Sequence, residues 1–225
     1  MTVCVPVHIT VDPVTAVSGL LQRADGERAC LVLAHGAGAG MQHPFMSAMA
    51  EELAAIGIAS LRYQFPYMEK RGRRPDSPAL CHATVRAAVA AARALTPELP
   101  LLAGGKSFGG RMTSQAQAGQ PLTEVRGLLF FGFPLHPPDR PSTDRAEHLF
   151  QVNIPLLFLQ GTKDAFAERT LLEPLVERLG QRATLALFQD ADHSFHVPAR
   201  SGRTDAQVCA DMMAAIAHWI DALLG

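Results

Sequence analysis

One serine lies in a pattern that suits a nucleophile. Residues 105–109 read G-x-S-x-G, with Ser107 at the centre. A nucleophile held on a sharp turn between a strand and a helix has a strained backbone, and the flanking glycines leave room for that turn. The first N–H groups of the following helix point toward such a serine. The pattern therefore predicts a nucleophile at Ser107, and a helix N-cap is the alternative role.

Two later residues have the types and the order that a serine nucleophile needs. A serine hydroxyl is a weak nucleophile without a general base, and the base needs an orienting acid. Asp164 follows the apolar run 154–160, and His193 follows the run 184–188. Serine, aspartate, histidine is the chain order found with a nucleophile on a strand-to-helix turn. We therefore expect Asp164 to be the acid and His193 the base, with a helix cap as the alternative for Asp164.

Two backbone N–H groups are expected to bind the negative oxygen that forms during attack on a carbonyl. One should belong to Phe108, the residue after the nucleophile. The other should come from the loop after the strand 29–34, where small residues let the backbone approach a substrate. We expect Ala37 to supply this second donor, with Gly36 as the next choice, and we expect His35 to pin the loop.

Two rival interpretations of these residues are weaker. A phosphate-binding P-loop ending in Gly105, Lys106 and Ser107 would need glycine at position 100, where the chain has Pro100. His193 and His196 have H-x-x-H spacing, with Asp190 and Asp192 nearby, but no third metal-ligand group is marked elsewhere. We therefore expect neither a metal nor another cofactor. The two aspartates are also poor candidates for the acid, because they crowd His193 along one loop.

Apolar runs alternate with helical patterns along the chain, which predicts a mostly parallel sheet with helices on both faces. The first two strands should form a hairpin. Functional groups should lie in loops at the carboxyl ends of the parallel strands. The expected strands are 5–11, 14–22, 29–34, 58–63, 100–103, 125–131, 154–160 and 184–188, and the expected helices are 44–56, 79–95, 108–118, 167–180 and 204–224.

Five motifs in the chain are similar to those of a known family, and they lie at residues 35–39, 104–112, 133–138, 160–164 and 192–195. With these motifs the chain resembles the α/β-hydrolase superfamily, in its small dienelactone-hydrolase-like branch. The resemblance implies an α/β-hydrolase fold, a Ser107–His193–Asp164 triad and hydrolysis of esters or related acyl compounds. Dienelactone hydrolases proper use a cysteine nucleophile, where this chain has serine.

Length and composition bound the other possibilities. The 225 residues, 48 % of them apolar, suit a single domain over 1–225. Twenty basic and twenty-one acidic residues give a net charge of −1, which disfavours a nucleic-acid partner. The N-terminal segment lacks the features of a signal peptide, and no apolar run approaches the length of a membrane span. Four cysteines with no C-x-x-C pair suit a reducing compartment. We expect a cytoplasmic enzyme with a small-molecule acyl substrate, and the sequence leaves its oligomeric state open.

Three features beside the expected site bear on substrate choice. The proline-rich segment 132–150 is short and predicts a minimal lid over an open site. The basic loop 70–74 follows a strand on the catalytic side and predicts a preference for short or anionic acyl substrates. Arg111 is expected to tie neighbouring loops together.

The alternative function is a non-catalytic interaction protein built on the same hydrolase scaffold.

Overall fold

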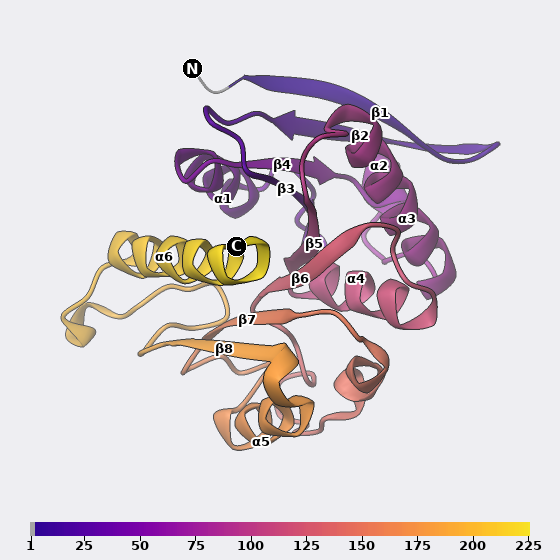
Figure 1. Ribbon diagram of the computed structural model, residues 1–225. Coiled ribbons are helices and arrows are strands. Elements are labelled where there is room, and N and C mark those ends of the chain that lie inside the picture. The colour runs from indigo at the N-terminus through magenta and orange to yellow at the C-terminus, as the bar shows by residue number, and fades with distance from the viewer. Residues whose placement is uncertain (1–2) are drawn as a thin grey trace.

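The computed structural model describes residues 3–225. Residues 1 and 2 belong to the segment from which no signal peptide is expected, and they lie outside the described part. The described residues form one eight-stranded sheet in the order β1-β2-β4-β3-β5-β6-β7-β8, which runs from top to bottom in Figure 1. The strands are β1 (Cys4–Asp12), β2 (Thr15–Gln22), β3 (Ala29–Ala34), β4 (Ile58–Tyr63), β5 (Leu101–Lys106), β6 (Val125–Phe131), β7 (Leu156–Gly161) and β8 (Ala183–Phe188).

The sheet is antiparallel only at its N-terminal edge. β1 and β2 form the expected hairpin, and β2 pairs antiparallel with β4. The remaining neighbours pair in parallel. Every residue of β3, β4 and β7 is buried, and for β3 this agrees with the continuous apolar run expected of a strand covered on both faces. The predicted α/β-hydrolase fold, with a mostly parallel sheet, is confirmed.

Helices cover both faces of the sheet. In Figure 1, α1 and α6 lie on one side and α3 and α4 on the other. Their buried side chains belong to two separate cores, and α5 shares the core of α3 and α4. The helices are α1 (Pro44–Ala55), α2 (Pro66–Glu69), α3 (Pro78–Leu95), α4 (Phe108–Gly119), α5 (Arg169–Leu179) and α6 (Asp205–Leu224), and the 3-10 helices are η1 (Asp144–Gln151), η2 (Gly180–Arg182) and η3 (Ala199–Ser201).

Helix α6 shows how local sequence and packing agree. Thr204 and Gln207 form a capping box that fixes where the helix begins. Its buried side chains recur at helical spacing and end at Trp219, which is 7 % exposed, and Ile220. A Cβ on Gly127 of β6 would lie 2.6 Å from the Trp219 ring, so the glycine makes room for the indole. The last helix is thereby seated against the middle of the sheet.

Two segments differ from expectation. β5 continues to Lys106 and does not end at residue 103. Gly104 permits this, because a Cβ there would lie 1.8 Å from the carbonyl oxygen of Leu129 on β6. Residues 104–106 therefore form strand where a P-loop would need a loop. The segment 64–78, between the expected strand 58–63 and the expected helix 79–95, is not wholly a loop. It contains the short helix α2, which begins at Pro66, a residue suited to the first position of a helix.

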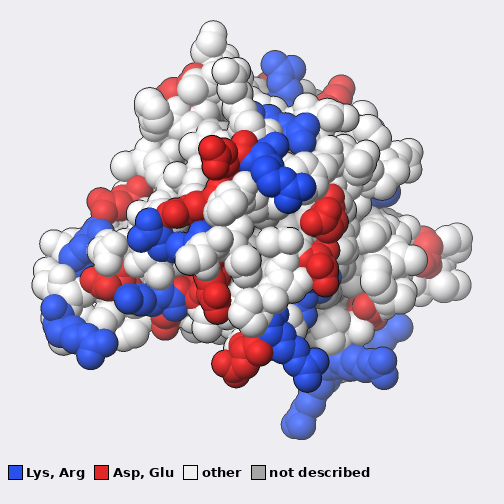
Figure 2. Space-filling model, turned by 90° about the horizontal axis from the view of Figure 1, so that it is seen from below, with Lys and Arg blue, Asp and Glu red and all other residues white. Residues whose placement is uncertain are grey.

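No helix within residues 3–225 is both long and apolar enough to cross a membrane. The segment 132–150 carries η1 except for its last residue, and it holds no large inserted domain. Figure 2 shows acidic and basic side chains interspersed over most of the face seen from below. That face therefore has no broad basic surface of the kind that nucleic-acid binding requires.

Candidate active site

Ser107 lies on the turn between β5 and α4. Its backbone has φ 50° and ψ −114°, a strained conformation for a residue with a side chain. Cβ atoms on Gly105 and Gly109 would each lie 2.5 Å from a backbone oxygen, on Ala34 and His35 respectively. The two glycines therefore let this turn sit against β3. Ser107 does occupy the N-cap position of α4, as the alternative role has it, but its side chain makes no capping hydrogen bond and is free for another contact.

The loop after β8 brings His193 to Ser107. The Nε2 atom of His193 lies 2.9 Å from Ser107 Oγ, and its Nδ1 atom lies 2.7 Å from Asp164 Oδ2. A carboxylate only accepts hydrogen bonds, so Nδ1 carries the proton and donates it. Nε2 is then free to accept the hydroxyl proton of Ser107. Ser107 and His193 lie 86 positions apart in the sequence, and Asp164 and His193 lie 29 positions apart.

Asp164 is held firmly after β7. It is 3 % exposed, and its Oδ1 accepts a hydrogen bond of 2.8 Å from the Phe166 N–H. Its Oδ2 accepts from His193 and also from Gln160 Nε2, at 2.6 Å. Gln160 is fixed in turn, because its Oε1 accepts from the Phe133 N–H at 2.9 Å. The sequence analysis missed Gln160, although a buried amide at the end of an apolar strand is a signal that could have pointed to it.

The Phe166 side chain also orients the base. Its ring packs on the His193 imidazole with the ring centroids 4.4 Å apart. The helix-cap role considered for Asp164 does not describe its contacts, since its partners are the loop and the histidine. One face of the imidazole is thus fixed by an aromatic ring and its Nδ1 by a carboxylate.

His35 orients the loop after β3. Its Nε2 accepts a hydrogen bond of 3.1 Å from the Phe65 N–H, so the proton resides on Nδ1, which donates to the Gly36 carbonyl at 2.7 Å. Burial lowers the pKa of His35 to about 4 and keeps the ring neutral. The peptide bond between Gly36 and Ala37 is trans, so its carbonyl and its N–H point in opposite directions. Because the carbonyl faces His35, the Ala37 N–H points away from His35. The expectation that His35 pins this loop agrees with these contacts.

The expected oxyanion donors lie beside Ser107. Ala37 and Phe108 line one cavity together with Ser107. Phe108 is the first residue of α4, where N–H groups have no intrahelical partner. The Gly38 N–H is already bonded to Tyr67 Oη at 2.8 Å, whereas the described part of the chain offers no partner to the Ala37 N–H. The arrangement can accommodate an oxyanion between Ala37 and Phe108.

A family model described as an alpha/beta hydrolase domain matches residues 27–221. The chain belongs to the α/β-hydrolase family. Membership supports a hydrolase activity.

Solved structures of similar fold extend over nearly the whole hydrolase. A dienelactone hydrolase from Anabaena variabilis ATCC 29413 is 20 % identical, with a TM-score of 0.76, and the match covers 100 % of this chain and 99 % of that one. XC6422 from Xanthomonas campestris, described as a serine hydrolase without a lid, is 20 % identical with a TM-score of 0.74, over 96 % and 94 % of the chains. A cold-adapted esterase from an Arctic intertidal metagenomic library is 19 % identical with a TM-score of 0.65, over 99 % and 94 %. At these identities the likeness shows the shared fold.

Two cavities meet at Ser107, and they differ in character. The larger has a volume of about 360 Å³ and is walled largely by apolar side chains, among them Phe45 and Met46. The smaller has a volume of about 200 Å³ and includes Arg111 and Arg145. Ala37, Ser107 and Phe166 line both cavities. A bound molecule could therefore place one part in each cavity with its reacting bond at the serine.

Lys106 is a further buried group that the sequence analysis missed. Its Nζ donates a hydrogen bond to the backbone carbonyl of His193 and lies 5.6 Å and 5.4 Å from the ring centroids of Phe45 and Phe195. A Cβ on Gly132 would lie 2.8 Å from this Nζ, so the glycine at the end of β6 leaves space for it. Lys106 thus ties the end of β5 to the loop that carries the histidine.

The buried ammonium of Lys106 predicts a rise in stability at alkaline pH. Burial lowers its pKa from 10.5 to about 8, so the unfolded chain binds more protons than the folded one between these values. The free energy of unfolding should therefore increase as the pH rises from about 8 to about 10.5. Urea unfolding across this range checks the slope. Lys106→Met should remove this contribution, and equal slopes in the two proteins would contradict the assignment.

The rival roles weighed for nearby residues do not match the contacts. His193 faces Ser107, whereas His196 Nδ1 lies 2.9 Å from Asp205 Oδ2 at the surface. Within the described residues, no group of three or more His, Cys, Asp or Glu side chains is arranged to hold a metal ion. The H-x-x-H pair is therefore split between two unrelated contacts.

The basic loop and Arg111 bear on two further expectations, and the substrate preference expected from the loop stays a prediction. The four basic residues of the loop 70–74 are exposed and line neither cavity at Ser107. The Arg111 side chain makes no hydrogen bond or ion pair within residues 3–225, so it does not tie neighbouring loops together in that way. Its guanidinium lies 5.8 Å from the Phe108 ring centroid.

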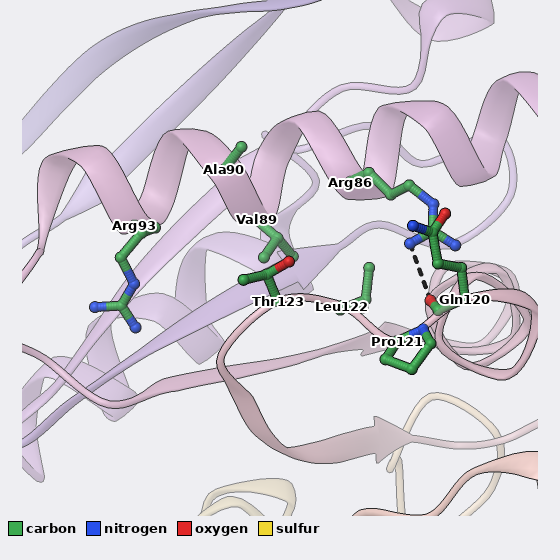
Figure 3. Close-up of a pocket in the computed structure, with 8 residues that line it drawn as sticks. All are labelled: Arg86, Val89, Ala90, Arg93, Gln120, Pro121, Leu122 and Thr123. Carbon is green, nitrogen blue, oxygen red and sulfur yellow. Dashed lines mark hydrogen bonds between the residues drawn. The ribbon is translucent and has the colours of Figure 1, made fainter.

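A third hollow lies elsewhere, between α3 and the connection that follows α4 (Figure 3). Arg86 on its wall donates hydrogen bonds to the carbonyls of Ala116 and Gln120. Arg93 donates to the backbone carbonyls of Pro97 and Leu99, in the connection after α3, and pairs with Glu124. These arginines already have protein partners and hold the connection in place. The hollow shares no lining residue with the cavities at Ser107.

Proposed function

We propose that this hydrolase cleaves a small acyl ester or thioester through an acyl-enzyme intermediate on Ser107. The observation that carries the proposal is the pair of hydrogen bonds joining Ser107 to His193 at 2.9 Å and His193 to Asp164 at 2.7 Å. A serine positioned in this way can be activated as a nucleophile, and an imidazole oriented in this way can accept its proton.

The reaction follows from these positions. The Ser107 oxygen attacks the acyl carbon, and His193 Nε2 takes the hydroxyl proton. As the carbonyl re-forms, the bond to the leaving group breaks and His193 returns the proton to the departing oxygen or sulfur. Water then attacks the acyl-enzyme and gives a proton to His193, which passes it to the Ser107 oxygen as the bond to the acyl group breaks and the acid leaves. Asp164 stabilises the imidazolium at both stages.

The oxyanion that forms in each half-reaction is bound by the N–H groups of Ala37 and Phe108. Preorganised donors of this kind act mainly on the transition state, because the charge develops there. Cavities of about 360 and 200 Å³ on either side of the serine suit a small substrate. The absence of a large insertion within 132–150 leaves the approach to the serine uncovered.

Labelling by a fluorophosphonate probe tests the proposal. Such a probe reacts with an activated serine, and peptide mapping should place the label on Ser107. Ser114 is a matched internal control, because it also lies 2.7 Å from a histidine nitrogen, His148 Nε2. Its hydroxyl donates to the Arg111 carbonyl, so His148 donates to Ser114 and does not activate it.

A panel of 4-nitrophenyl and coenzyme A esters then identifies the bond that is cleaved. Turnover of the oxygen esters alone would define a carboxylesterase, and turnover of the coenzyme A esters a thioesterase. The alternative, a non-catalytic interaction protein on this fold, predicts no label on Ser107 and no turnover of any ester.

The orienting role of His35 gives a separate prediction. In His35→Ala the Gly36 carbonyl keeps only the Ala39 N–H, at 3.2 Å, as a donor, so the Ala37 N–H is aimed less firmly at the oxyanion. We expect kcat to fall on the order of 10–100-fold with little change in KM, since the contact serves the transition state. Steady-state kinetics measures this, with His218→Ala, outside both cavities at Ser107, as the control. An unchanged kcat in a folded His35→Ala protein would contradict the orienting role of His35.

A further inference from the structure

Two arginines line the smaller cavity at Ser107 without an acidic partner. Arg111 lies on α4, one turn after the serine, and Arg145 lies on η1. Arg111 Nε is buried and has no hydrogen-bond partner. Among residues 3–225, neither side chain forms an ion pair or a hydrogen bond. Other arginines on the surface behave differently: Arg169 pairs with Glu173, and Arg203 with Asp211.

The positive charges lie close enough to affect one another. Burial and the neighbouring charge of Arg145 both lower the pKa of Arg111, and no carboxylate offsets them. Holding two unpaired cations in a partly buried cavity is unfavourable unless an anion binds between them. A guanidinium is also the group best suited to bidentate binding of carboxylate and phosphate.

The surrounding structure fixes the pair in position. Ser114 Oγ on α4 accepts a hydrogen bond of 2.7 Å from His148 Nε2 on η1 and donates one of 3.0 Å to the Arg111 carbonyl. Burial and the charge of Arg111 lower the pKa of His148 to about 4, so this histidine is neutral. The contact docks η1 on the nucleophile helix three residues after Arg145. Both arginines are therefore carried by elements that are joined to each other.

We propose that Arg111 and Arg145 form an anion subsite that binds a carboxylate or phosphate group of the substrate, a few atoms from the bond that Ser107 attacks. The proposal rests on the hydrolase function proposed above and specifies its substrate class. The subsite takes the acidic end, and the apolar cavity of about 360 Å³ takes the other part of the molecule.

A preference for anionic substrates that comes from Arg111 and Arg145 has a different physical origin from one that comes from the loop 70–74. The side chains of that loop are exposed, so any attraction they exert acts through solvent and is screened by salt. The pair at Ser107 is partly buried and contacts the bound anion directly. A preference that arises from the pair should therefore persist at high ionic strength.

Matched esters test the proposal. In the acyl series, kcat/KM is compared for 4-nitrophenyl pentanoate and mono-(4-nitrophenyl) glutarate, in which a carboxylate replaces the terminal methyl group, and for the phosphonate analogue of the glutarate. In the alcohol series, propyl acetate is compared with the acetate ester of 3-hydroxypropanoate. We expect an acidic member of at least one series to be preferred about tenfold or more at both low and high salt. The carboxylate and phosphonate arms distinguish the two anions.

Charge variants locate the subsite. Arg111→Gln and Arg145→Gln should each lower kcat/KM for the acidic ester much more than kcat/KM for its neutral partner, so that most of the acidic preference is lost. Arg145→Glu should reverse the preference. Arg140→Gln is the matched control, because it removes one exposed positive charge from the same segment and Arg140 lines neither cavity. If Arg111→Gln does not fold, the two variants at Arg145 carry the test.

The outcomes separate this proposal from the proposed function. Hydrolysis of neutral esters with no acidic preference in either series overturns the subsite alone, as does a preference that survives both glutamine variants. If no ester is cleaved and Ser107 is not labelled, the proposed function fails. Calorimetric titration of the Ser107→Ala protein with glutarate and with inorganic phosphate then decides the subsite independently. Saturable binding lost in Arg145→Gln supports it, and no binding overturns it.

Discussion

Ser107→Ala is expected to lower kcat by a factor on the order of 10³ or more, with the fold intact, because the members of a serine–histidine–acid group act as a unit. The methyl group of alanine fills the same turn and leaves the neighbouring glycines unchanged. Hydrolysis of the best ester in the panel measures the loss, and circular dichroism and thermal unfolding check the fold. His193→Ala should be as damaging, and the double variant little worse than either single one.

Two controls make this result specific to the site. Ser114→Ala removes the other serine that contacts a histidine, and His196→Ala removes the other histidine of the H-x-x-H pair. The Ser114 variant should keep its fluorophosphonate label on Ser107, and the His196 variant should keep its kcat. Undiminished ester hydrolysis by pure Ser107→Ala protein would end the assignment of the nucleophile.

The fold could be predicted well because its signals are local. Continuous apolar runs identify strands buried on both faces, and helical spacing identifies the covering helices. The boundary of β5 was missed because Gly104 and Gly105 resemble a loop in sequence. In the structure both glycines belong to β5, where the backbones of Leu129 on β6 and Ala34 on β3 lie so close that a Cβ at either glycine would not fit. That constraint comes from neighbouring strands, which the local sequence does not display.

The candidate site was predictable to the extent that chain order and strand ends reveal it. Ser107, Asp164 and His193 each follow a strand, and the structure brings them into hydrogen-bonding contact. Their catalytic roles remain proposals until the variants are measured. Lys106 and Gln160 were missed because their partners, a backbone carbonyl and a carboxylate, are set by tertiary packing. Arg111 was given a structural role because nothing in the sequence shows that it lacks an acidic partner.

Asp164→Asn is expected to cost about 10³–10⁴-fold in kcat, although it changes only one atom. Oδ2 accepts from His193 Nδ1 and Gln160 Nε2, and Oδ1 accepts from the Phe166 N–H. An amide has only one oxygen to offer. If its NH₂ faces His193, the ring must place its proton on Nε2, and it can no longer accept the proton of Ser107.

The opposite orientation of the amide is also unfavourable. It sets the NH₂ against the Phe166 N–H and removes the negative charge that stabilises the imidazolium. Gln160 cannot compensate by rotating its own amide, because its Oε1 already accepts a hydrogen bond from the Phe133 N–H. Steady-state kinetics should therefore show a large fall in kcat with KM little changed, and slow labelling of Ser107. Asp192→Asn, on the same loop as the histidine but outside these contacts, is the matched control. A kcat within tenfold of the parent in folded Asp164→Asn would mean that another group orients His193.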